Sequence, residues 1–130
     1  MKGEKDLNKL LQTLQPTLNT GDYVFCVVND LSLVHIKDCI LFFREAEGLT
    51  VVIKKELAHS LRLDYSYVAA WITLTVHSSL EAVGLTAAFS TALAERGISC
   101  NVVAAFYHDH IFVNKNDIEK AMEILNGFSA

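Results

Sequence analysis

The stretch SSLEAVGLTAAFSTALAERGISCNVVAAFYHDHIFVNKNDIEKAMEIL, residues Ser78–Leu125, decides the fold because its hydrophobic period changes from helix to strand and back. Apolar residues recur at helical spacing from Gly84 to Arg96, and Gly97 suits a left-handed stop just past the helix end. Ile98–Phe106 and Ile111–Val113 are typical of strands. The expected buried stripe of the helix is Leu85, Ala88, Phe89, Ala92 and Leu93.

A second helix closes this stretch. Asn116 is the expected N-cap, with Glu119 three residues on. Ahead of the stretch, Tyr67–Val76 is apolar on both faces and is predicted to be a central strand. The core-facing residues expected in the closing helix are Ile118, Ala121, Met122 and Leu125.

The first part of the chain repeats this order with one gap, since Asn29–Asp38 matches neither a helix nor a strand. We therefore predict two halves, residues 1–64 and residues 65–130, related by an internal repeat. The predicted elements are a helix ending near Pro16, strands at Tyr23–Val28, Cys39–Arg44 and Leu49–Ile53 around a turn at Glu45–Gly48, and a helix at Lys55–Leu61.

Composition narrows the function classes. The chain has 130 residues, 52% of them hydrophobic, and a formal net charge of -4. This hydrophobicity excludes intrinsic disorder, and the lack of a basic patch argues against nucleic acid as a partner. The apolar runs are too short for a membrane helix, so we expect a cytoplasmic protein without a membrane partner. The three cysteines are expected to be buried, reduced thiols.

His108, Asp109 and His110 form the stretch that looks most like chemistry. On a strand, His108 and His110 would share a face and could reach one metal ion. A zinc site needs a third protein ligand, and the segment offers no further His or Cys. The repeat places the three residues at a hairpin turn, so the favoured interpretation is polar turn residues, and we predict no catalytic residue, metal ligand or cofactor.

Ser78–Glu81 has the spacing of a capping box, in which Glu81 satisfies backbone donors. The alternative interpretation is a ligand site, because free N–H groups at a helix N-terminus attract an anion such as an amino-acid carboxylate. Gly84 would allow close approach to the backbone, and Glu81 or Asp109 could receive an amino group.

Three motifs carry a family resemblance: Val83-Gly84-Leu85 at the start of the helix, Leu93–Ile98 at its end, and Asp109–Val113 on the hairpin's far strand. With these motifs the chain resembles the ACT domain family, small ligand-sensing modules with a strand–helix–strand–strand–helix–strand plan. Over nearly its whole length it is similar to short bacterial ACT-like proteins of poorly defined function. It is also similar to the ACT halves of a eukaryotic cytosolic arginine sensor.

The resemblance implies an α+β fold of two ferredoxin-like ACT halves, with antiparallel sheets and helices on one face. It implies a regulatory or sensory module that binds a small metabolite, such as an amino acid, at an interface between ACT units, with a homodimer as the expected assembly. The alternatives are a protein-interaction module with a vestigial pocket and, third, a small metal-dependent enzyme using His108, Asp109 and His110. The ligand contacts implied by position are Glu81, Ala82, Val83, Gly84, Phe106 and Asp109.

Two departures from the family plan lead to further expectations. The chain ends right after its last helix, where an ACT domain has a fourth strand, and an open sheet edge invites aggregation. We expect Tyr23–Val28 to take that place, within the chain or from a partner. The first half lacks a clear first helix, so we expect the second half to build most of any ligand site.

Overall fold

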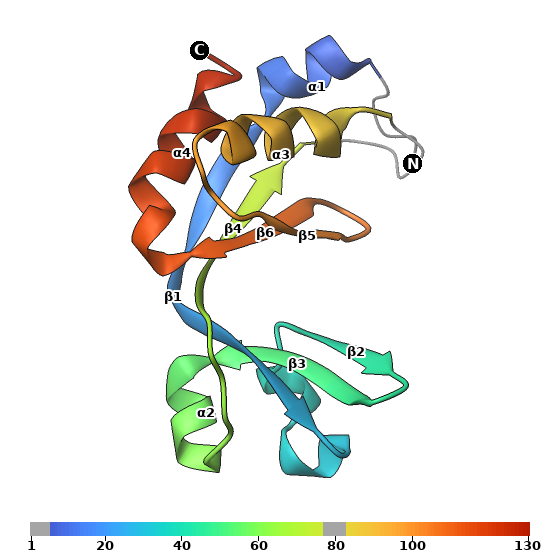
Figure 1. The fold of residues 1–130 in the computed structure, drawn as a ribbon. Coiled ribbons are helices and arrows are strands. Elements are labelled where there is room, and N and C mark those ends of the chain that lie inside the picture. Colours follow the sequence, from blue (N-terminus) through green and yellow to red (C-terminus); the bar gives the residue numbers. More distant parts are fainter. Residues whose placement is uncertain (1–5, 77–82) are drawn as a thin grey trace. The chain divides into compact units, whose positions relative to one another are not determined.

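The computed structural model describes residues 6–76 and 83–130, which form an α+β fold around antiparallel strands (Figure 1). The hydrogen-bonded strand order is β2 (Leu41–Glu45), β3 (Gly48–Lys54), β1 (Gln15–Val28), β4 (Val68–Thr75), β6 (Asp109–Asn114) and β5 (Asn101–Ala104). The chain divides into two compact units: unit 1 is Met1–Thr20 with Ala70–Ala130, and unit 2 is Gly21–Ala69. The predicted fold class is confirmed. In the sequence, unit 2 is inserted between two parts of unit 1, so the units are not two consecutive halves. The division into residues 1–64 and 65–130 describes the sequence repeat and stays a prediction.

The α-helices of unit 1 lie on one side of its strands (Figure 1). The alternation along β4 explains this layering, because Ala70, Ile72 and Leu74 enter the core beneath the helices while Trp71 and Thr73 point to the other face. From α3, Leu85, Phe89 and Leu93 meet these strand residues. The elements are α1 (Leu7–Thr13), the first part of β1 (Gln15–Val28), most of β4 (Val68–Thr75), α3 (Leu85–Glu95), β5 (Asn101–Ala104), β6 (Asp109–Asn114), η3 (Lys115–Asp117) and α4 (Ile118–Gly127).

Unit 2 builds a smaller core on the same plan. Its antiparallel strands place Tyr23 opposite Lys54 and Val28 opposite Leu49. The core is made mainly of β-branched side chains from β1 and β3, with Ala58 of α2. Its elements are the second part of β1, η1 (Leu31–Leu33), η2 (Ile36–Asp38), β2 (Leu41–Glu45), β3 (Gly48–Lys54), α2 (Lys55–Leu61) and the start of β4.

The segment that matched neither helix nor strand forms the two single turns η1 and η2. The Asp30 side chain accepts a hydrogen bond from the Ser32 backbone N–H at 2.8 Å, which caps the first turn. Asp and Ser compete for backbone hydrogen bonds in this way and thereby oppose a continuing helix. His35, with ψ 134°, is extended and separates the two turns. No full first helix therefore forms in unit 2.

The place beside β4, which we expected Tyr23–Val28 to take, is occupied by β1. A strand from the first half of the sequence takes this place, as predicted, but the residues are not those that we expected. Tyr23–Val28 pairs with β3 in unit 2, whereas the part of β1 that belongs to unit 1 ends at Thr20. Pro16 fits the outer strand of unit 1, because an edge strand tolerates a residue without a backbone N–H.

Two local predictions are wrong. Asn116 is not the cap of the last helix: the Asn114 side chain accepts from the Asn116 N–H at 2.9 Å and opens η3, after which α4 begins without a side-chain cap. The hairpin turn does not contain Asp109 and His110 either. The Ala105 N–H donates to the His108 carbonyl at 3.0 Å, and Asp109 then starts β6 opposite Ala104.

Candidate functional site

The ligand contacts implied by the family resemblance fall into three groups in the structure. Glu81 and Ala82, together with the rest of the suggested capping box, lie outside the described residues. Val83 and Gly84 precede α3, and the Val83 side chain is exposed to solvent. Phe106 and Asp109 lie on the β5–β6 hairpin, in very different surroundings.

Gly84 is held in a backbone conformation that needs glycine. Its φ is 98°, in the left-handed region, and its carbonyl accepts the first helical hydrogen bond of α3, from the Ala88 N–H at 2.9 Å. A Cβ added there would lie 3.2 Å from Leu7 Cδ2. The close approach predicted for a ligand at this backbone is thus made, at least on one side, by the Leu7 side chain of α1.

Asp109 is the one buried charged residue among those that the structure describes, with 8% of its surface exposed. By strand alternation it shares a face with Ile111 and Val113, which lie in the core beneath the helices. Burial raises the pKa of the Asp109 carboxyl above its ordinary value, and the nearby His108 opposes this rise. A buried carboxylate of this kind favours a cationic partner.

Phe106 lies at the hairpin tip and is 70% exposed. Its ring meets Tyr107 edge-on, with ring centroids 5.1 Å apart, and Tyr107 is exposed as well. The exposed aromatic pair and the buried Asp109 therefore offer different chemistry within the one hairpin.

His110 belongs to a polar network that the sequence did not reveal. The indole Nε1–H of Trp71 donates to His110 Nδ1 at 3.0 Å, and Thr73 Oγ1 lies 3.1 Å from the same nitrogen. Asn19 Nδ2 in turn donates to Thr73 Oγ1 at 2.9 Å and to the Trp71 carbonyl at 3.2 Å. Three strands are thereby joined on the sheet face opposite the helices. The only signal in the sequence was the alternation of polar residues along Trp71–Thr75.

The network fixes the protonation of His110. An indole N–H can only donate, so Nδ1 must be the unprotonated acceptor. Burial lowers the pKa of His110, and the neighbouring His108, with ring centroids 6.5 Å apart, lowers it further. The Nδ1 of His108 is itself buried and has no hydrogen-bond partner among the described residues. His110 is thus held neutral, as part of the sheet.

Within residues 6–76 and 83–130 no three His, Cys, Asp or Glu side chains gather closely enough to hold a metal ion. Cys26, Cys39 and Cys100 are free thiols, of which only Cys26 is fully buried. Burial raises the pKa of Cys100 to about 11 and raises those of the other two, so reactive thiolates are disfavoured.

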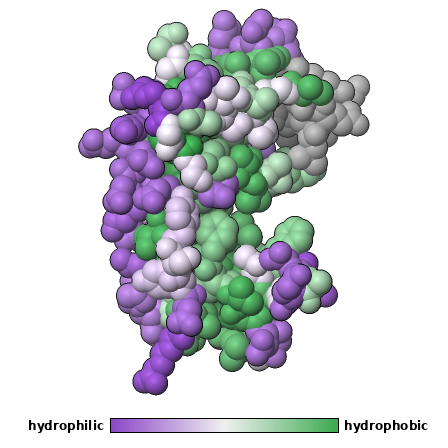
Figure 2. Space-filling view, in the orientation of Figure 1, coloured by the Kyte–Doolittle hydropathy of each residue, from purple (hydrophilic) through white to green (hydrophobic). Residues whose placement is uncertain are grey.

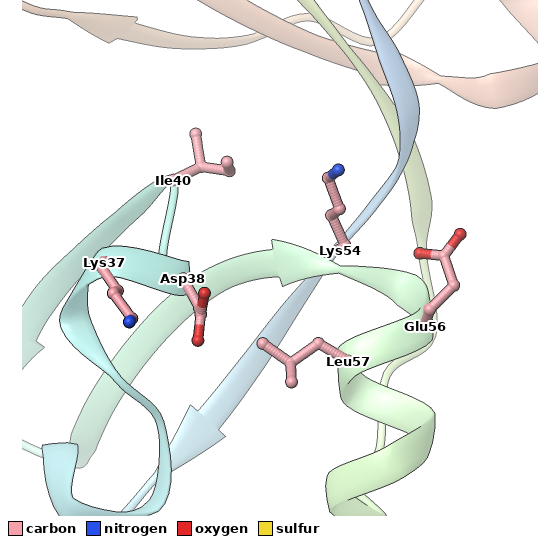
Figure 3. Close-up of a pocket in the computed structure, with 6 residues that line it drawn as sticks. All are labelled: Lys37, Asp38, Ile40, Lys54, Glu56 and Leu57. Atoms are coloured by element: carbon pink, nitrogen blue, oxygen red, sulfur yellow. The ribbon is translucent and has the colours of Figure 1, made fainter.

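A cavity of about 650 Å³ opens in unit 2, between η2 and the start of α2 (Figure 3). We term it the unit 2 cavity. Sequence reasoning missed it, because Asn29–Asp38 matched neither a helix nor a strand and the Lys54-Lys55 pair fits an ordinary solvated face. Its lining residues are Lys37, Asp38, Ile40, Lys54, Glu56 and Leu57.

No helix in the described residues is long and apolar enough to span a membrane.

Comparison with solved structures finds a protein of unknown function from Vibrio cholerae, described as a possible transport protein. It is 53% identical, with 97% of this chain and 98% of that chain covered and a TM-score of 0.88. The regulatory subunit of aspartate kinase from Thermus thermophilus, in a ligand-free form, is 10% identical over 88% of this chain and 97% of that chain, with a TM-score of 0.64. The aspartate kinase of Clostridium acetobutylicum is 11% identical over 90% of this chain and 34% of that chain, with a TM-score of 0.66. At these low identities the two kinases show a shared fold alone.

Family models agree with this fold. One ACT domain model matches residues 2–70 and a second matches residues 66–127. Among curated proteins none matches the chain significantly. Two consecutive matches that together span nearly the whole sequence show a tandem arrangement, and the chain belongs to the ACT domain family.

Proposed function

We propose that the protein is a regulatory module that binds an amino acid where one ACT unit meets another, with a homodimer as the working assembly. The ACT family matches and the fold shared with aspartate-kinase regulatory subunits support a ligand-binding regulatory module. The binding residues we propose are the Glu81–Gly84 loop with Phe106 and Asp109. The site requires no metal, cofactor or catalytic residue.

The observation that carries the proposal is the buried Asp109 carboxylate. With 8% of its surface exposed, it has lost most of its hydration, and its raised pKa reflects that cost. An ammonium group would stabilise the ionised carboxylate, whereas a neutral or anionic ligand would not. Amino acids and related amines are therefore the ligand class that Asp109 favours.

The regulatory mechanism follows from linkage. A ligand that binds one arrangement of ACT units more tightly than another shifts the population toward the first. The size of this shift is limited by the difference between the two affinities. Binding alone produces the shift, so the mechanism needs no catalytic chemistry. The module would pass this shift to whatever protein it contacts.

Thermal-shift screening against the common amino acids tests the proposal. A ligand that binds only the folded state at 100 times its Kd adds about 2.7 kcal/mol of stability, which raises the unfolding midpoint by several degrees. Asp109→Asn should abolish that rise because the amide no longer offers a negative charge. Glu119→Gln, a matched change at an exposed position of α4, should leave the rise intact. A wild-type protein that responds to none of the amino acids, or an Asp109→Asn variant that responds fully, would count against the proposal.

A second candidate is a protein-interaction module with a vestigial pocket. It is favoured by Val27 and Phe43, which are 64% and 66% exposed and both lie opposite Thr50 on one sheet face of unit 2. Hydrophobic side chains reach the surface over unit 2 (Figure 2). Exposed apolar groups in a row often mark an interaction site. The same screen separates the candidates, because a scaffold without a pocket shows no amino-acid response.

A further inference from the structure

The unit 2 cavity exists because two single turns stand where unit 1 has a helix. In unit 1 the helix that follows β4 is the 11-residue α3, whose Leu85, Phe89 and Leu93 are buried. In unit 2 the corresponding segment is η1 and η2, and Val34 is its one fully buried residue. Fewer side chains fill the space beside α2, and a cavity of about 650 Å³ remains.

Charges of both signs line this cavity. Lys37 and Asp38 come from η2, Lys54 is the last residue of β3, and Glu56 lies in the first turn of α2 (Figure 3). Within the described parts of the chain none of these four makes an ion pair, whereas the neighbouring Lys55 Nζ lies 3.4 Å from Asp22 Oδ2. Their charges remain available to a ligand.

The remaining wall is apolar. Leu57 and Ile40 line the cavity, and Figure 3 shows the Leu57 side chain extending from α2 toward η2, which carries Asp38. Pockets of roughly 300–1,000 Å³ with apolar walls and a few placed polar groups are typical of small-molecule sites. A complementary ligand carries a positive and a negative group on one small frame, with an apolar branch.

We propose that the unit 2 cavity binds a small zwitterion with an apolar side chain. Its carboxylate meets Lys54, its ammonium meets Asp38, and its side chain packs on Leu57. The inference rests on the proposed function for the ligand class, but it adds a site in unit 2 that is separate from Asp109 in unit 1. It also gives unit 2 a binding site of its own, although this unit has no full helix after β1.

Amide-resolved NMR titration of the full chain tests the site, with L-leucine as the probe. Leucine should shift the amides of Lys37–Ile40 and Lys54–Leu57. Isocaproate and isopentylamine keep the apolar branch but carry a single charge each. Each should need at least about tenfold more ligand for half-saturation at these amides, since losing one charge contact of about 1.4 kcal/mol costs that factor.

Two variants locate the charges. Lys54→Met and Asp38→Asn keep the side-chain length or shape and remove one charge, so each should raise the half-saturating leucine concentration about tenfold. Lys120→Met, on an exposed position of α4 in unit 1, serves as the matched control and should leave it unchanged.

The outcomes are distinguishable. Unmoved amides at Lys37–Ile40 and Lys54–Leu57 would overturn the inference, and so would equal binding of leucine and its single-charge analogues. If leucine or another amino acid moved only amides around Asp109, the inference would fail while the proposed function stood. Movement in the unit 2 cavity alone would support the inference and reject Asp109 as the site.

Discussion

The two units of this chain differ in the segment that follows β4 in unit 1 and β1 in unit 2. In unit 1, β4 leads to α3, an 11-residue helix that buries Leu85, Phe89 and Leu93. In unit 2, β1 leads to η1 and η2, where Leu33 and Ile36 remain 52% and 59% exposed. The same strand plan is thus covered by a full helix in one unit and by two turns in the other.

This difference shows what an ACT-type sheet needs from its helices. The hydrophobic core of unit 2 relies on β-branched side chains from its strands, with α2 as its one helix. Since the sheet supplies most of that core, unit 2 forms its core without a full helix after β1. Without the side chains of such a helix, less of the volume beside α2 is filled. The cavity lined by Lys37, Asp38 and Lys54 opens there.

The largest effect should come from truncating a buried side chain of α3 in unit 1. Phe89 is completely buried, and Phe89→Ala should cost about 3–5 kcal/mol of unfolding free energy because it leaves a large cavity. Urea denaturation measures this cost. Phe106→Ala removes the same ring from a site that is 70% exposed, and it should change stability by less than about 0.5 kcal/mol. Similar losses in both variants would show that α3 is not the centre of the unit 1 core.

A smaller effect is expected at the matching place in unit 2. Val34 is 3% exposed and joins the turns to the core, so Val34→Ala should cost about 2 kcal/mol, the transfer value of the lost methyl groups with a small cavity term. Leu33→Ala, one residue away and half exposed, is the control and should cost well under about 1 kcal/mol. A Val34→Ala loss as large as that of Phe89→Ala would mean that the turns carry as much of the core as the helix does.

Strong periodicity made most of the fold predictable. Lys55–Leu61 was predicted as a helix with the bounds that α2 has, and Leu85–Glu95 lies one residue inside the predicted helix at each end. Prediction failed where a side chain competes with the pattern. Asn114, not Asn116, opens the turn before α4, since its side chain caps the residue two positions on. The first part of β1 was missed because its polar residues next to Pro16 do not alternate like a buried strand.

The site was less predictable, for a physical reason. Whether Asp109 points into the core depends on the register and start of β6, which are set by pairing with Ala104 and by the turn closed between Ala105 and His108. A shift of one residue would have turned Asp109 to the other face. Likewise, the hydrogen bonds of His110 link it to β4, 39 residues earlier at Trp71, a distance that no local pattern encodes.

The smallest effect should come from His110, which makes the stability of unit 1 depend on pH. Its pKa is lowered by burial and by His108, so between that lowered pKa and the ordinary value near 6.5 the unfolded chain binds more protons than the folded one. Stability contributed by neutral His110 should therefore be present above about pH 6.5 and fall as the pH drops through this range. The loss should be about 1 kcal/mol, because a proton on Nδ1 removes the acceptor for Trp71 Nε1.

The variant His110→Asn keeps an acceptor near the position of Nδ1 and cannot titrate. Its urea midpoint should therefore change less between about pH 7 and pH 5 than the midpoint of the wild type. His35→Asn, an exposed position in unit 2, should keep the wild-type slope. Equal slopes in wild type and His110→Asn would show that the network tolerates a protonated imidazole and would remove this distinction between the units.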